Sequence, residues 1–280
     1  MKTTAQDKLK AVIEKMINKI ENKEIKQWFK PWNGTIPANF STKKTYRGFN
    51  VAMLWFIAEE MEYTTNSWLT FKQIKALKGT VKKGEKSTPI FFYKPLKIED
   101  KETGEEKTIP MLKMYYVFNL DQTEGIDYKT VSENVQRTDI EAFVANTGAT
   151  IKQAQEAFYS PSMDFVGMPS LQAFISENHY YSTLLHELSH WTGHSTRLDR
   201  GLTGRFGDDN YAFEELIAES SAALLGASLG IDHNEMRHEA YLESWLKVLK
   251  AEPKILWKVF SQSQKVFDHL TSYQNQQEAA

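Results

Sequence analysis

The sequence predicts an α+β protein of two domains, an N-terminal α+β domain at residues 1–128 and a mainly helical C-terminal domain with a small sheet at residues 139–280. Its 280 residues exceed one average domain. Residues 1–130 hold 23 Lys+Arg against 16 Asp+Glu, whereas residues 131–280 hold 11 against 20. This asymmetry indicates a basic half that faces nucleic acid and an acidic half with another task.

Helical and extended patterns are mixed in the N-terminal half. Apolar residues recur with a helical period within residues 5–29, and helices are also expected at 51–61 and 70–77. A β-rich run at 89–93 and a strand at 111–119 enclose a predicted hairpin tip at 97–107. The polar residues 127–139 are the expected linker.

The C-terminal half has mostly helical periodicity. A helix is expected at 138–146, and two short extended pieces follow at 157–169 across a Ser-Pro turn. The remaining predicted helices contain residues 183–193, 213–225, 239–249 and 253–270.

Composition excludes several classes of protein. There is no cysteine, so neither a disulfide framework nor a thiolate zinc site is possible. The N-terminal residues lack the continuous apolar region of a secretory signal, and no apolar run approaches 18 residues. We expect a soluble, cytoplasmic protein that has no membrane partner.

The stretch 183–193, TLLHELSHWTG, carries the strongest chemical signal. His186 and His190 are four residues apart, so on a helix both imidazoles leave the same face. This pattern, H-E-x-x-H, is typical of two ligands of a tetrahedral Zn²⁺. Glu187 is then placed to act as general base on water at the metal. Gly193 is expected to end the helix as a C′ glycine.

A catalytic zinc with three protein ligands needs one more ligand. The position due for the third histidine of a metzincin is Thr196, and His194 follows the helix-ending glycine. The acidic stretch 213–225, FEELIAESSAALL, offers Glu215 and Glu219 on one helix face. We favour Glu215 as the ligand and Glu219 as the group that orients a ligand histidine, with the reverse assignment left open. Glu214 projects roughly 100° away and is expected either in solvent or as a negative charge near the N-terminus of the helix.

Aromatic residues lie among basic ones in the N-terminal half, a pattern typical of single-stranded DNA binding. Bases stack on aromatic rings while cations follow the phosphates. The candidate DNA contacts are Trp32, Tyr46, Arg47, Trp68, Lys72, Lys82, Lys83 and Lys86. The competing interpretation is that the tryptophans belong to the core and the lysines to a solvated surface.

Several separated segments together resemble the ArdC-type antirestriction proteins of mobile elements. In the first half these are KPWNGTIPANFSTKKTYRGFN, SWLTFKQIKALKGTVKKGEK and YYVFNLDQTEGI; in the second, AFYSPSMDFVGMP, HELSHWTGHSTRLDR and YAFEELIAESSAALLG. The resemblance implies an N-terminal single-stranded-DNA-binding domain and a C-terminal zincin-like metallopeptidase domain. It also implies protection of incoming conjugative DNA from restriction in the recipient. The segment at 157–169 looks like the edge strand on which zincins bind an extended peptide.

Two functions follow from this resemblance. In the first, the protein is a zinc peptidase recruited to single-stranded DNA that cleaves an unknown protein substrate there. In the second, it only masks DNA and its zinc stabilises the fold. Glu187 favours the first, because a structural metal site does not need a base beside its ligands.

Overall fold

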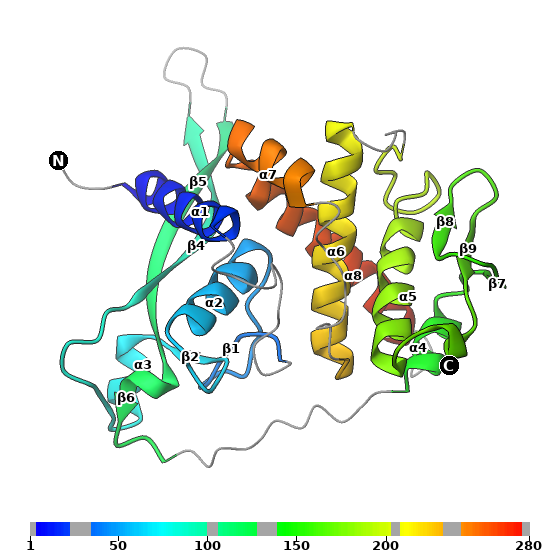
Figure 1. Cartoon of the computed structure of the whole chain (residues 1–280). Helices are drawn as coiled ribbons and strands as arrows, with labels where there is room; N and C mark the ends of the chain where they lie inside the picture. Colours follow the sequence, from blue (N-terminus) through cyan, green and yellow to red (C-terminus); the bar gives the residue numbers. More distant parts are fainter. Residues whose placement is uncertain are drawn as a thin grey trace.

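Three helices of the C-terminal half lie between two sheets at opposite ends of the molecule (Figure 1). The computed structural model describes residues 4–22, 35–99, 106–127, 139–202, 208–231 and 242–275. The long hairpin of β4 and β5 stands at one end, and the three-stranded sheet of β7, β8 and β9 stands at the other. Helices α5, α6 and α8 lie between them, which confirms the expected α+β class.

The N-terminal half consists of short strands, three helices and one long hairpin. Its elements are α1 (Ala5–Glu21), β1 (Ala38–Asn39), α2 (Phe49–Glu60), β2 (Ser67–Leu69), α3 (Phe71–Ala76), β3 (Thr80–Val81), β4 (Thr88–Glu99), β5 (Glu106–Asn119), η2 (Leu120–Gln122) and β6 (Thr123–Glu124). One sheet has the order β1-β2-β5-β4, in which only β1 and β2 are parallel, and β3 pairs with β6.

The C-terminal half is mainly helical, as expected. Its elements are α4 (Ile140–Asn146), β7 (Ile151–Gln153), β8 (Phe158–Ser160), β9 (Phe165–Met168), η3 (Leu171–Ala173), α5 (Glu177–Trp191), α6 (Asp209–Leu229), α7 (Leu242–Ala251) and α8 (Ile255–Asn275). The small sheet has the order β7-β9-β8, with β7 parallel and β8 antiparallel to β9. Strand β8 is therefore an edge strand.

The sequence placed the helices more accurately than it placed the hairpin. Strand β4 continues to Glu99 and β5 begins at Glu106, in a region expected to be a hairpin tip. Their register is unbroken from Thr88 opposite Val117 to Glu99 opposite Glu106. The predicted linker lies largely within residues 128–138, outside the described residues.

Local signals fix the ends of the helices that carry the site. The side chain of Ser176 caps α5 by accepting a hydrogen bond from the backbone N–H of His179 at 3.1 Å. Helix α6 ends at Gly230, whose φ of 73° lies in the left-handed region that glycine tolerates. Alanines and serines recur along α6 and let it pack closely between α5 and α8.

A hydrophobic core crosses from one half of the chain to the other. On α2, Val51 and Trp55 are buried against Leu224 and Ala227 of α6. A larger cluster joins buried residues of α1, α2, β4 and β5 to those of α5, α6 and α8. The two halves therefore share apolar surface that neither buries alone. No helix in the described ranges is long and apolar enough to cross a membrane.

Candidate functional site

A cleft of about 860 Å³ opens where β8, α5 and α6 meet. His186, Glu187 and His190 line it from α5, and Glu214 and Glu215 line it from α6. Ala157, Phe158 and Tyr159 bring the edge strand β8 to the same cleft. The structure therefore places the HExxH residues beside a free strand edge, the arrangement needed for an extended peptide.

Three potential ligand atoms converge inside this cleft. The Nε2 atoms of His186 and His190 are 3.1 Å apart. Glu215 places Oε1 3.3 Å from Nε2 of His190 and Oε2 3.5 Å from Nε2 of His186. Ligands at 2.0–2.1 Å from a tetrahedral ion stand about 3.3 Å from each other. The spacing of these atoms therefore fits one metal ion, and among the described residues they form the one such group.

The outward nitrogens of both histidines face carboxylates. Nδ1 of His186 is 3.3 Å from Oε2 of Glu219, and Nδ1 of His190 is 3.1 Å from Oε1 of Glu214. A carboxylate can only accept, so the hydrogen-bond contact with Glu214 assigns the hydrogen of His190 to Nδ1. Nδ1 of His186 lies near Glu219 without a hydrogen bond, and the same tautomer would let it donate to that carboxylate. In the neutral imidazoles both Nε2 lone pairs then face one another and Glu215. A cation between them removes the repulsion, so the residues present fit a divalent metal.

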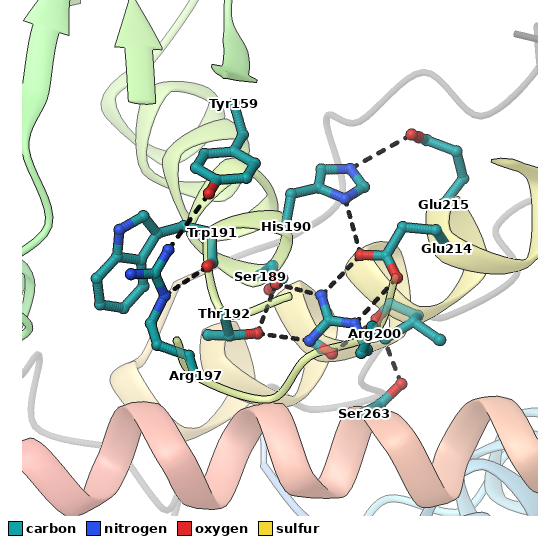
Figure 2. Close-up of polar contacts among 12 residues, drawn as sticks. Tyr159, Ser189, His190, Trp191, Thr192, Arg197, Arg200, Glu214, Glu215 and Ser263 are labelled. Carbon is teal, nitrogen blue, oxygen red and sulfur yellow. Dashed lines mark hydrogen bonds and ion pairs between the residues drawn. The ribbon is translucent and has the colours of Figure 1, made fainter. Parts of the chain in front are cut away.

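Glu214 corrects one expectation from the sequence. It is not in solvent but is largely buried between His190 and Arg200 (Figure 2). Burial alone would raise the pKa of Glu214, but the hydrogen bonds from Arg200 and His190 lower it below its ordinary value. The stretch EELIAE thus places three carboxylates around the two histidines. Glu214 faces Nδ1 of His190, Glu219 faces Nδ1 of His186, and Glu215 faces Nε2 of both rings.

Arg200 is a site residue that the sequence analysis missed. Its guanidinium donates to both oxygens of Glu214, at 2.6 and 2.9 Å, and to the backbone carbonyl of Ser189 at 2.7 Å. A third donor reaches Oγ1 of Thr192 at 2.7 Å. Arg200 therefore neutralises the carbonyl end of α5 while fixing the carboxylate that holds His190 (Figure 2). The loop that returns it to the helix has no local pattern that predicts this contact.

Gly193 occupies the predicted C′ position, but not for the predicted conformational reason. Helix α5 ends at Trp191 with Thr192 as its C-cap, and Gly193 is not among the glycines with positive φ. A Cβ at this position would stand 2.8 Å from Cδ2 of Leu202 and 2.9 Å from Nη2 of Arg200. The glycine thus leaves the space that Arg200 occupies.

Glu187 and His194 both lie outside the group of converging ligand atoms. Glu187 is buried and lines the cleft without belonging to the ligand group. His194 is not in that group either, and its Nδ1 accepts a hydrogen bond from Oγ1 of Thr196 at 2.8 Å.

Glu215 approaches Nε2 of both histidines, whereas Glu219 approaches only Nδ1 of His186. These positions favour Glu215 as the ligand and Glu219 as the group that orients His186. Metal ligation by these residues stays a prediction.

Metal affinity should rise with pH through the neutral range. Burial alone would lower the pKa of His190, but its hydrogen bonds to Glu214 and Glu215 raise it to about 9. Without metal this ring is therefore protonated at pH 7, and an incoming ion must displace the proton. Competition titrations with a chromophoric chelator at pH 6, 7 and 8 should show progressively tighter binding. Equal affinities at the three pH values would contradict this explanation.

The structure corrects one of the predicted aromatic DNA contacts, Trp68. Trp68 is fully buried and packs edge-to-face on Tyr63, so no base can stack on it. Tyr46 packs against the core, and burial raises the pKa of its hydroxyl. Trp32 lies outside the described residues.

The predicted basic contacts are at the surface. Lys72, Lys82, Lys83 and Lys86 are all exposed, although Nζ of Lys82 donates to the carbonyl of Asp121 at 2.7 Å. Arg47 forms an ion pair with Asp268 of α8. Among the residues of the N-terminal half that the structure describes, the exposed aromatic ones are Phe71, Phe92, Tyr93, Tyr115 and Tyr116. Because the runs IFFY and MYYVF lack polar alternation, the sequence did not indicate which rings face solvent.

Known families match the two halves of the chain separately. Residues 6–118 match the N-terminal domain of anti-restriction factor ArdC, and residues 138–262 match a zincin-like metallopeptidase. The chain is 34% identical over 279 residues to the DNA primase TraC of Escherichia coli, covering 89% of this chain but 26% of that protein. It is 33% identical to protein y4eC of Sinorhizobium fredii, covering 88% of this chain and 85% of that protein.

Solved structures match nearly the whole chain. The metal-free crystal structure of the antirestriction protein ArdC from the R388 plasmid has a TM-score of 0.82 and 40% identity. Its Mn(II)-bound structure has a TM-score of 0.78 and 38% identity. Each comparison covers 94% of this chain and 96% of that one. Since both halves match in order and a solved relative is covered almost completely, the chain belongs to the ArdC family of antirestriction proteins.

Proposed function

We propose that this protein binds single-stranded DNA through its N-terminal half and hydrolyses peptide bonds at a zinc centre in its C-terminal half. The observation that carries the enzymatic part is the convergence of His186, His190 and Glu215 beside Glu187 in an open cleft. The family carries the antirestriction part, which we extend to the protection of incoming conjugative DNA in a recipient cell.

Zinc is the proposed resident metal. Two imidazoles and one carboxylate form the ligand set of many catalytic zinc sites, in which the fourth position stays open. The ArdC relative was solved with Mn(II), whose preference leans toward carboxylate and water ligands. The nitrogen-rich set in this chain favours zinc over manganese. When bound, the metal supplies Lewis-acid activation of a water molecule.

The protein's own groups provide the remaining requirements of peptide hydrolysis. Glu187 accepts the proton of the attacking water and returns it to the leaving amine. Glu219 and Glu214 hold the rings of His186 and His190 in fixed orientations. A substrate peptide in extended form pairs with the free edge of β8, which lies along the same cleft.

A second candidate is that DNA masking alone protects the DNA. The exposed rings of the N-terminal half belong to elements other than those that line the cleft. DNA binding and hydrolysis therefore have separate surfaces. We therefore propose that DNA binding alone protects the incoming DNA, and that the peptidase acts on a separate protein substrate.

A cleavage experiment tests the enzymatic proposal directly. The zinc-loaded full chain is incubated with a poly-dT oligonucleotide and recipient-cell extract, and new peptide termini are identified by mass spectrometry. New termini should appear with the wild-type protein and disappear with a metal chelator or with Glu187→Gln. The absence of new termini with wild-type protein, or the same termini with Glu187→Gln, would contradict the proposal.

A further inference from the structure

Two exposed aromatic rings form a pair on the β4–β5 hairpin. Phe92 of β4 is 44% exposed and Tyr115 of β5 is 51% exposed. Their ring centroids are 5.7 Å apart at an interplanar angle of 72°, an edge-to-face contact. Apolar rings held in this way in water leave ring faces available to a ligand.

Strand alternation separates this pair from the ring of Tyr116, over which Lys8 of α1 lies. Phe91 and Leu112 are buried on the same face as Tyr116. Phe92 and Tyr115 alternate with those residues and so point to the opposite face. Ile90 and Val117 share that face and are buried, so the exposed part of it begins at the two rings.

Lysines share the face of the aromatic pair. Lys113 lies directly opposite Phe92 in the register and is two residues from Tyr115, and Lys94 is two residues from Phe92. Neither lysine forms an ion pair with a residue in the described part of the chain. The side chains described on this face, from positions 88–94 and 111–117, include no carboxylate. The exposed part of this face, around Phe92 and Tyr115, is therefore aromatic and positively charged.

This combination selects single-stranded nucleic acid among possible ligands. An aromatic ring stacks on any base, and neighbouring cations bind the phosphates of the same strand. A duplex hides the faces of its bases inside the helix. Two rings on a narrow hairpin also provide much less than the roughly 800 Å² per partner of a stable protein interface.

We infer that the face of Phe92 and Tyr115 is a base-stacking site for single-stranded DNA, with Lys94 and Lys113 holding the flanking phosphates. The inference rests on the proposed DNA binding and gives it a location. It replaces the buried Trp68 as the aromatic part of the contact.

Fluorescence polarisation of a labelled poly-dT oligonucleotide tests the stacking site on the full chain. Loss of one stacked base weakens binding by about 5- to 150-fold. The affinity of Phe92→Ala/Tyr115→Ala for the oligonucleotide should therefore fall by about 5-fold or more. Phe92→Tyr/Tyr115→Phe keeps both rings and should bind like the wild type. Phe71→Ala is the matched control, because this 54% exposed ring, with Lys75 over it, lies on α3. It should retain wild-type affinity.

The dependence on salt tests the lysines independently. Lys94→Gln/Lys113→Gln should reduce the slope of log K against log salt by about 1.4 for a single strand. Wild-type affinity in Phe92→Ala/Tyr115→Ala, or an equal loss in Phe71→Ala, would overturn the location. An equal loss of duplex affinity in the double variant would overturn stacking. If the wild-type protein itself does not bind poly-dT, the proposed DNA binding fails instead.

Discussion

Replacing Glu187 with glutamine should lower peptide hydrolysis by about 10²–10⁴-fold, the usual cost of losing a general base. The amide has nearly the same shape as the carboxylate but cannot take the proton of the attacking water. Glu187 lies outside the group of converging ligand atoms, so the metal content of the variant should equal that of the wild type. Cleavage rate and bound metal, measured on the same preparation, check both statements. A variant that loses its metal would show that Glu187 is a ligand.

The same variant separates the two tasks of the protein in a conjugation assay. A recipient that restricts incoming DNA should still be protected by Glu187→Gln if DNA binding alone gives protection. Phe92→Ala/Tyr115→Ala should then lose protection while it retains hydrolysis of a peptide substrate. Loss of protection in Glu187→Gln would instead make proteolysis part of antirestriction.

Removal of Glu215 should abolish metal binding, whereas removal of Glu219 should only weaken it. Glu215 approaches the inward nitrogens of both histidines, whereas Glu219 approaches only the outward nitrogen of His186. The loss of a group that orients a ligand typically costs about 10–100-fold in metal affinity. Glu215→Ala should therefore fall well below Glu219→Ala in a zinc titration.

The exposed Glu156 of the same half provides a control for the charge removed by these substitutions. Glu156→Ala should bind metal like the wild type. Complete loss of metal in Glu219→Ala, with binding retained in Glu215→Ala, would reverse the ligand assignment.

The sequence predicted those parts of the site that lie within one helix. Four-residue spacing put His186 and His190 on one face of α5, and the same spacing put Glu215 and Glu219 on one face of α6. Helical geometry alone determines these relations. It does not predict which carboxylate approaches which histidine nitrogen, because that depends on how the two helices pack.

The contact between Glu214 and Arg200 could not be predicted in this way. It depends on a loop that brings Arg200 back to the end of α5, where its backbone N–H donates to the carbonyl of Gly193 at 3.0 Å. That return is a tertiary feature without a periodic signal. Helical geometry predicts that Glu214 projects in a different direction from Glu215 and Glu219. It does not predict that His190 and Arg200 cover that direction, so the expectation of a solvent-exposed Glu214 was wrong.

The aromatic residues of the first half show a related limit. Trp68 and Phe92 lie on the same face of the sheet in the strand register, yet Trp68 is fully buried and Phe92 is 44% exposed. In IFFY and MYYVF every position is apolar or aromatic, so strand alternation gives no sign of which rings are exposed. Only the packing of other elements over each position resolves it.

The core shared by the two halves links the proposed metal site to the folding of the proposed DNA-binding half. Because Val51 and Trp55 of α2 are buried against α6, the first half cannot unfold without exposing the helix that carries Glu215. A metal that binds only the folded form at 100 times its dissociation constant adds about 2.7 kcal/mol to the free energy of unfolding. That stabilisation extends through the common core to residues far from the ion. If the proposed metal is bound, its supply then sets the fraction of molecules in which the proposed DNA-contacting surface stays folded, whether or not the site performs hydrolysis.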